Sequence, residues 1–295
     1  MPVPSSKDEL KDKKFWLALL AEFTGTLFYV LFGCGTYAKA GASGYGSLST
    51  ALAFGLLAGT LLWAFQRTSG GHFNPAVSFG FLVTRRVSLV RGVFYILAQL
   101  IGGIIGCLLL KGLTPSTSEY GLLAPSEVAV DQAFGLELFI TFLFVFTYFA
   151  TYDPYRSDLA GSAPLTIGLA SVLLHFFALP YTGAGMNPAR AFAPAVVTNK
   201  FAESHWVYWI GPIVGALVAG FLYEFLFAAN ACVNKFLHFF RPQYDNDNDF
   251  SQPPPPLKRK PKKEKKADPE APAETPVENG KEGEATEMQE NKESS

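Results

Sequence analysis

The tripeptide Asn-Pro-Ala occurs twice in this chain, as Asn74-Pro75-Ala76 and as Asn187-Pro188-Ala189, and each copy opens an apolar segment too short to cross a bilayer. Asn is a favoured N-cap residue and Pro is favoured at the first helical position, so each motif predicts the start of a short helix. Short, broken apolar segments at corresponding places in two halves of a chain indicate a transport pathway near the bilayer midplane. The repeated motif therefore constrains both fold and function.

Six runs of the chain are long and apolar enough to cross a membrane: about 15–36, 49–66, 92–110, 133–151, 163–180 and 205–228. A bilayer core of about 30 Å requires about 20 helical residues. The period-two alternation that is typical of a membrane β-barrel is absent from these runs. We therefore expect an all-α membrane protein with six transmembrane helices and two re-entrant half-helices.

The distribution of basic residues indicates the orientation. One side of a six-span arrangement carries the N-terminal lysines, Arg67, Arg85, Arg86, Arg91 and Arg156. The other side carries only Lys39, Lys111 and Lys200. Because Lys and Arg are enriched in cytoplasmic loops, both termini are expected in the cytoplasm. The expected location is the cell membrane, with the chain crossing it several times.

The two halves of the chain resemble each other. The first span reads AEFTGTLFYVLFG around Glu22, and the fourth reads LELFITFLFVF around Glu137. Small residues four apart, which allow helices in lipid to approach closely, occur in the third and sixth spans. These are Gly102 with Gly106 and Gly211 with Gly215. Since three spans per half is an odd number, the second half must be inserted upside down, which gives an inverted repeat.

The domain organisation follows from these patterns. We expect a cytoplasmic N-terminal tail at 1–14 and a channel domain at 15–229, with repeats at about 15–111 and 131–229. The C-terminal tail, 230–295, is expected to form a short amphipathic helix at 230–241 and then to be disordered, because it holds too little apolar surface to fold.

The tail carries three weak interaction motifs. The helix at 230–241 could bind calmodulin, and Pro253–Lys258 fits a ligand of an SH3 domain. The basic run Lys258–Lys266 could bind anionic lipid. A proline spacer and a solvated run of charge are the simpler interpretations of the last two, and both remain open.

Physical chemistry suggests what would pass between the two short helices. In an inverted repeat their N-termini meet near the midplane, so two positive helix ends face one place. They repel cations, while each Asn amide can donate a hydrogen bond to a passing oxygen atom. This combination suits a neutral, hydrogen-bonding permeant such as water.

Four segments, SGGHFNPAV, YTGAGMNPARAFAPAV, RSDLAGSAPLTIG and HWVYWIGP, carry a resemblance to a known family. Over roughly residues 10–230 the chain resembles the aquaporins of the major intrinsic protein family, in the water-selective branch that includes lens-fibre and brain water channels. The resemblance implies a homotetramer with one pore in each subunit.

The resemblance also implies a selectivity filter. Its four positions, counted from the two motifs, are Phe54, His175, Ala184 and Arg190. Phe, His and Arg together narrow the pore to about the width of a water molecule, and the fixed charge of Arg190 opposes protons and cations. Glycerol facilitators have a smaller residue in place of His175 and an Asp after the Arg, where this chain has Ala191.

Five further residues are candidates for the pore or its support. Glu22 and Glu137 are expected to brace the two loops by accepting their hydrogen bonds, rather than to relay protons, because backbone groups at membrane depth cannot be left unpaired. His72 would line the pore or brace its loop. The resemblance implies that Tyr29 and Tyr152 narrow the pore, although both could instead be interfacial aromatic residues.

The sequence thus predicts a passive, water-selective channel that is driven by an osmotic gradient, excludes protons and ions, and needs no cofactor or metal. It contains no triad, phosphate loop or metal cluster that would indicate an enzyme, and nothing in it points to nucleic acid. Two alternatives remain open. One is a membrane junction or scaffold protein of low water permeability, and the other is a facilitator of glycerol or another small neutral solute.

Overall fold

The structure is a computed structural model that describes residues 9–43, 46–115, 120–241 and 244. The predictions for the SH3-ligand motif, the basic run and the disordered tail lie outside these residues, as does most of the N-terminal tail.

Six helices among the described residues are long and apolar enough to cross a membrane, as the sequence predicts. Five of them are α2 (Lys13–Ser43), α3 (Gly46–Ser69), α5 (Leu89–Leu113), α6 (Val130–Thr151) and α7 (Ala163–Thr182), and the sixth, Glu203–Phe227, contains α9 (Val207–Leu222). A 3₁₀ turn, η1 (Glu203–Trp206), precedes α9, and a π-helical turn, η2 (Tyr223–Phe227), continues it. Most of these helices extend a few residues beyond the apolar runs, up to polar caps such as Ser88 and Ser162.

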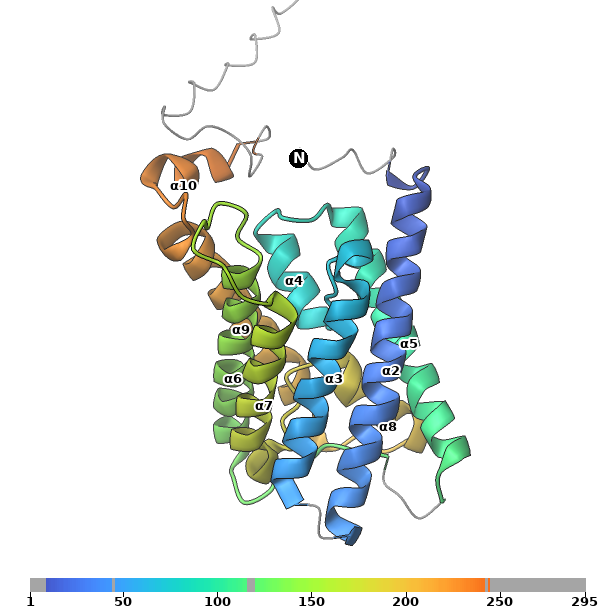
Figure 1. The fold of residues 1–295 in the computed structure, drawn as a ribbon. Helices are drawn as coiled ribbons and strands as arrows, with labels where there is room; N and C mark the ends of the chain where they lie inside the picture. Colours follow the sequence, from blue (N-terminus) through green and yellow to red (C-terminus); the bar gives the residue numbers. More distant parts are fainter. Residues whose placement is uncertain (1–8, 44–45, 116–119, 242–243, 245–295) are drawn as a thin grey trace, which may run out of the picture. The chain divides into compact units, whose positions relative to one another are not determined.

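Two short helices, α4 (Pro75–Val83) and α8 (Pro188–Thr198), complete the bundle. In Figure 1, α4 occupies the upper half of the molecule and α8 the lower half. Within each half the first long helix packs on the last, α2 on α5 and α6 on α9, and α3 packs on α7 between the halves. The predicted fold, with six spans and two half-helices in an inverted repeat, is therefore confirmed.

Glycines set the distance between the paired helices. A Cβ atom added to Gly106 of α5 would lie 2.3 Å from the carbonyl oxygen of Leu27 on α2. In the second half, a Cβ added to Gly215 of α9 would lie 2.3 Å from the carbonyl oxygen of Leu138 on α6. Any larger residue would push these helices apart, so the small-residue pairs have the packing role that their spacing predicts.

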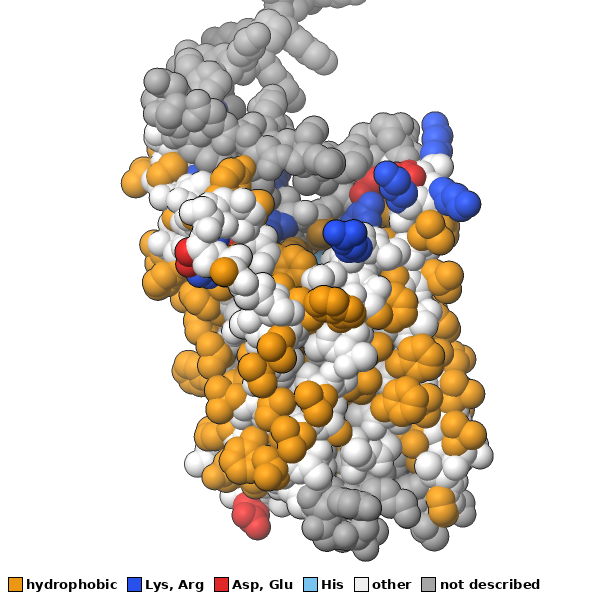
Figure 2. All heavy atoms as spheres, in the orientation of Figure 1, with side chains coloured by type: hydrophobic (Ala, Val, Ile, Leu, Met, Phe, Trp, Pro, Cys, Tyr) orange, Lys and Arg blue, Asp and Glu red, His pale blue; other side chains and the backbone are white. Residues whose placement is uncertain are grey.

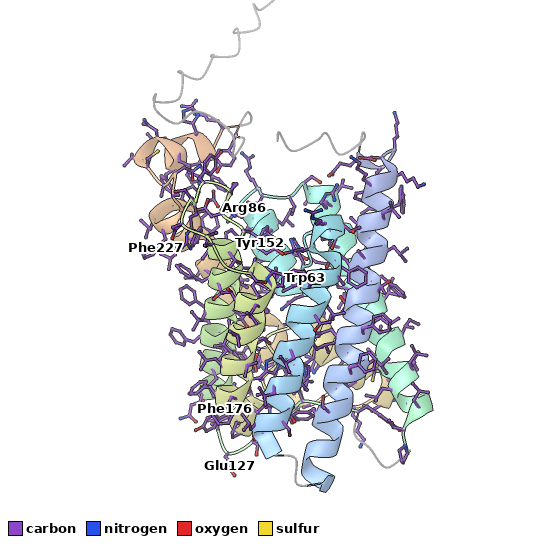
Figure 3. All side chains as sticks on the ribbon, viewed as in Figure 1. Trp63, Arg86, Glu127, Tyr152, Phe176 and Phe227 are labelled. Carbon is purple, nitrogen blue, oxygen red and sulfur yellow. The ribbon has the colours of Figure 1, made fainter. Side chains whose placement is uncertain are left out.

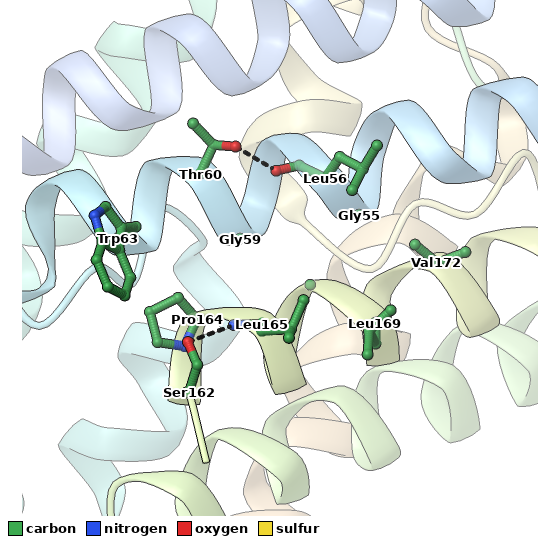
Figure 4. A pocket seen from close by; sticks show the side chains of 11 residues that line it. Gly55, Leu56, Gly59, Thr60, Trp63, Ser162, Pro164, Leu165, Leu169 and Val172 are labelled. Atoms are coloured by element: carbon green, nitrogen blue, oxygen red, sulfur yellow. Dashed lines mark hydrogen bonds between the residues drawn. The ribbon is translucent and has the colours of Figure 1, made fainter.

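The outer surface is apolar. Figure 2 shows hydrophobic side chains over the middle of the visible face, with Lys and Arg side chains at its upper end. Large side chains such as Trp63, Phe176 and Phe227, which Figure 3 labels, are more than half exposed, which suits contact with lipid. An apolar groove of about 320 Å³ between α3 and α7, shown in Figure 4, includes Trp63 and Leu165 and opens on this outer surface.

The C-terminal helix is shorter than the predicted 230–241: α10 covers Val233–Phe239. Its lysine, Lys235, is buried and contacts Glu224 of η2 at 2.5 Å, and Glu224 also binds Arg86 at 2.7 Å. Burial lowers the pKa of the Lys235 ammonium, although attraction to Glu224 opposes this shift. Lys235, one of the basic residues of the predicted amphipathic helix, is therefore paired with the bundle and is not on a solvent-exposed face.

Candidate functional site

Each half-helix begins at the asparagine of its motif. The side-chain oxygen of Asn74 accepts a hydrogen bond from the backbone N–H of Ala76 at 2.8 Å, and that of Asn187 accepts from Ala189 at 3.0 Å. The proline between them occupies the first helical position in both cases. These caps satisfy backbone donors that would otherwise be unpaired.

The two caps also join the two halves. The amide nitrogen of Asn74 donates to the carbonyl of Met186 at 3.0 Å, and that of Asn187 donates to the carbonyl of Phe73 at 2.9 Å. Phe73 and Met186 have the same left-handed backbone conformation, with φ of 48° in both. The N-termini of α4 and α8 therefore meet, and each Asn amide keeps a second hydrogen with which it can donate to another group.

Glu22 braces the loop before α4. One of its carboxylate oxygens accepts from the Ser69 hydroxyl at 2.6 Å and the His72 N–H at 2.9 Å. The other accepts from the Phe73 N–H at 2.6 Å and the Gln99 amide at 2.7 Å. The carboxylate is fully buried, so these donors take the place of its hydration.

Glu137 has the equivalent contacts in the second half. One carboxylate oxygen accepts from the Thr182 hydroxyl at 2.6 Å and the Gly185 N–H at 2.8 Å, and the other accepts from the Met186 N–H at 2.7 Å. Each glutamate thus holds an irregular loop at membrane depth, where water is not available to satisfy its backbone.

Three of the four predicted filter residues are in direct contact. The rings of Phe54 and His175 stack with their centroids 4.4 Å apart, and the guanidinium carbon of Arg190 lies 5.6 Å from the centre of the Phe54 ring. Nδ1 of His175 lies 2.8 Å from the carbonyl oxygen of Ser171, and Arg190 donates from Nη1 to the carbonyl of Gly121 at 2.6 Å. One hydrogen bond to a backbone carbonyl therefore fixes the orientation of each of these two polar side chains.

Ala184 is placed differently. It is fully buried in the loop before α8, with a left-handed φ of 52°, and its N–H donates to the Thr182 hydroxyl. It lies in the loop that leads to the cap of α8. None of the described contacts joins its side chain to the other three residues.

Two of the predicted filter residues carry buried polar atoms without a partner in the described protein. These are Nε2 of His175 and both Nε and Nη2 of Arg190. Because Nδ1 of His175 donates to a carbonyl, its Nε2 is an acceptor, whereas the two Arg190 nitrogens are donors. Unpaired buried polar groups are costly, so this arrangement fits a small molecule that both donates and accepts hydrogen bonds.

A cavity of about 20 Å³ lies where the two half-helices meet, which is room for about one water molecule. Four of the residues predicted for the pore line it: Tyr29, His72, Asn74 and Asn187. The Tyr29 ring also lies 5.4 Å from that of Phe54, so it connects this cavity with the filter. His72 contacts Ser78 through Nδ1, so it both lines the cavity and supports its loop.

The sequence did not single out the other four residues that line the cavity: Ala58, Phe73, Phe144 and Tyr148. Tyr152 is not among the lining residues. Its ring stacks on that of Tyr148 at 5.9 Å, one turn further along α6, and its hydroxyl lies 3.3 Å from the Gln66 side chain. The spacing of four residues between these aromatic side chains could have indicated a common face.

Comparisons with known proteins show the family of the chain. The family model described as "Major intrinsic protein" matches residues 9–223. The lens fiber major intrinsic protein of Lithobates pipiens is 47% identical over 222 residues, covering 74% of this chain and 84% of that protein. The human protein of the same name is 46% identical with the same coverage.

The fold also resembles a solved structure. An aquaglyceroporin from Plasmodium falciparum superposes with a TM-score of 0.64 and 22% sequence identity, covering 71% of this chain and 95% of that one. At this identity the likeness supports the fold alone.

Proposed function

The chain belongs to the major intrinsic protein family, and from this premise we propose that it is a passive, water-selective channel that conducts along an osmotic gradient. The observation that carries this proposal is the contact of Phe54, His175 and Arg190, whose unpartnered atoms can accept from and donate to one small molecule. Water offers two donors and two acceptor sites in the smallest volume.

Charge selectivity has two supports. Arg190 carries a fixed positive charge within the filter, and it is fully buried. The N-termini of α4 and α8 add partial positive charge where they meet. A cation or a hydrated proton would meet repulsion at both places. The free hydrogens of the two Asn amides can hold the oxygen of a neutral permeant between them.

Osmotic swelling of oocytes that express the full chain tests this proposal. We expect faster swelling in hypotonic medium than in uninjected oocytes, with no increase in ionic conductance. Swelling equal to that of uninjected oocytes, in cells where surface labelling detects the protein, would contradict it. Close pairing of membranes between expressing cells, together with absent swelling, would favour a junction or scaffold protein.

The topology and the assembly are part of the same proposal. The basic residues at the end of the bundle where α2 begins and α10 lies favour a cytoplasmic location for both termini in the cell membrane. Family membership favours a homotetramer. Contacts of the tail with calmodulin, an SH3 domain or anionic lipid stay predictions from the sequence.

Mercurial reagents should inhibit the wild type weakly and the Ala184→Cys variant strongly. Cys34 and Cys107 are buried away from the lining of the central cavity, and Cys232 lies next to α10. Ala184 already carries a Cβ atom in its left-handed conformation, so cysteine adds only the thiol. Swelling with and without mercuric chloride measures this. Strong inhibition of the wild type that disappears in Cys34→Ser would place Cys34 on the path instead.

Removing the ring of Tyr152 should raise the permeability of each channel to water. We expect a small rise for Tyr152→Phe, because its 3.3 Å hydroxyl contact with Gln66 is long, and a larger rise for Tyr152→Ala. Glycerol should still be excluded, because the filter is unchanged. Swelling must be normalised to the amount of protein at the surface. Equal normalised swelling rates in both variants and the wild type would indicate that Tyr152 is an interfacial anchor and does not narrow the pore.

A further inference from the structure

Aromatic side chains of α6 line the central cavity between the two halves. They are not part of the proposed filter. Tyr148 is 2% exposed and lines the central cavity together with Asn74 and Asn187. Its ring is held from two sides. It packs edge-on against Phe144 at 5.2 Å and stacks on Tyr152 at 5.9 Å with an interplanar angle of 8°.

The Tyr148 hydroxyl forms a hydrogen bond that joins the two halves of the molecule. It donates to the carbonyl of Gly71 at 3.0 Å, in the loop that leads to the first asparagine. Gly71 and Asn74 belong to the first half, whereas Tyr148 belongs to α6 of the second half. The ring is therefore fixed at both ends, by stacking on its own helix and by a hydrogen bond to the opposite loop.

This bond affects the path in two ways. It holds the ring beside a cavity that has room for about one water molecule. It also occupies the Gly71 carbonyl, in a loop whose N–H groups at His72 and Phe73 already donate to Glu22. A water molecule that passes Tyr148 meets its aromatic ring and a Gly71 carbonyl that already accepts a hydrogen bond. It therefore loses hydrogen bonds that it had in bulk solvent.

We infer that Tyr148 is a further residue that sets the rate of the water path, as a narrowing between the asparagines and the end of the bundle where Tyr152 lies. Its ring limits the width, and its bond to Gly71 keeps the ring in place. The inference rests on the proposed function, because it assigns a second narrowing to the same path.

Tyr95 provides a matched control. It is also a buried tyrosine, and its hydroxyl donates at 2.8 Å to the carbonyl of Ser69, the last residue of α3 and two residues before Gly71. It lies on α5 with its ring centroid 5.3 Å from that of His72, and it is not among the residues that line the cavity. Tyr95→Phe therefore removes a tyrosine bond to the backbone just before the same loop, together with a 3.2 Å bond from Arg91, without changing the lining of the cavity.

The test is oocyte swelling by the full chain and three variants, normalised to surface protein. Tyr148→Phe should conduct about two- to tenfold faster than the wild type, the range that one net hydrogen bond spans. Tyr148→Leu should be faster still, and Tyr95→Phe should match the wild type. Thermal stability of each purified variant shows that it is folded.

The outcomes separate this inference from the proposed function. If the wild type swells and both Tyr148 variants match it or are slower, the inference is wrong and the channel proposal stands. An equal rise in Tyr95→Phe and Tyr148→Phe would also overturn it, since loosening of the loop would then explain the effect. If only Tyr148→Leu swells, the narrowing is supported and conduction by the wild type is refuted. No swelling in any variant overturns both.

Discussion

Glycerol uptake should rise about tenfold or more above the wild-type level when Phe54 and His175 are both replaced by alanine. Their rings stack at 4.4 Å, and the guanidinium carbon of Arg190 lies 5.6 Å from the Phe54 ring, so the two rings are the bulky groups of the predicted filter. Removing both rings opens a space for the carbon chain of glycerol, and a tenfold gain requires a barrier lower by only about 1.4 kcal/mol. Uptake of radiolabelled glycerol by oocytes, normalised to surface protein, measures the change.

The control for this experiment is Phe177→Ala. Phe177 lies on the same helix as His175, but its side chain is 53% exposed on the outer surface. Its removal deletes an aromatic ring from α7 without widening the path, so glycerol uptake should stay at the wild-type level. A wild-type protein that already carries glycerol as well as the double variant does would refute the filter assignment and favour a facilitator of small neutral solutes.

The ring of Tyr148 should limit the increase in glycerol uptake of the variant that lacks the rings of Phe54 and His175. Glycerol that passes the widened filter still meets the cavity of about 20 Å³ between the asparagines. Adding Tyr148→Leu to the double variant should therefore raise glycerol uptake further, whereas Tyr148→Leu alone should leave glycerol excluded by the intact filter. Glycerol uptake by that single variant would mean that the filter is not at Phe54 and His175.

The parts of the fold that are local in sequence could be predicted. Apolar runs of about 20 residues identify spanning helices, and an Asn-Pro pair identifies the start of each half-helix, because both signals depend on neighbouring residues only. The positions Phe54, His175 and Arg190 could be proposed because the family resemblance implies their distances from the two motifs. The structure brings these three side chains together.

The parts that depend on packing between the halves could not be predicted. Phe144, Tyr148 and Tyr152 share a face by their spacing, but which face of α6 looks inward depends on how α7 and α9 pack on it. The left-handed conformation of Phe73 and Met186 is unusual for such large residues. It is associated with the bonds that their carbonyls receive from the opposite asparagines, which no local pattern encodes.

Replacing Glu22 with alanine should prevent most of the protein from folding. The change leaves four donors without their acceptor: those of Ser69, His72, Phe73 and Gln99. Each unpaired buried donor costs about 1–3 kcal/mol, and the total free energy of unfolding of a domain is only about 5–15 kcal/mol. Surface labelling and the thermal midpoint of detergent-solubilised protein measure the loss.

Glutamine variants separate hydrogen bonding from shape, since glutamine keeps the size of the side chain but replaces one acceptor oxygen with an N–H donor. At Glu137, either orientation of the new amide would oppose a backbone N–H, that of Gly185 or that of Met186. Glu22→Gln and Glu137→Gln should therefore both lower the thermal midpoint, by less than the alanine variants do. Glu127→Gln is the control, because Glu127 is exposed at the lower end of the bundle in Figure 3.

The same variants distinguish bracing from proton relay. A relay predicts a stable Glu22→Gln protein with altered proton movement, because only a titrating group would be lost. Bracing predicts the reverse: reduced stability, and normal water selectivity in the protein that does reach the surface. Glutamine variants as stable as Glu127→Gln would show that the seven hydrogen bonds to the two buried carboxylates do not hold the loops. The two halves should also respond alike, because each glutamate binds the backbone that leads into its own half-helix.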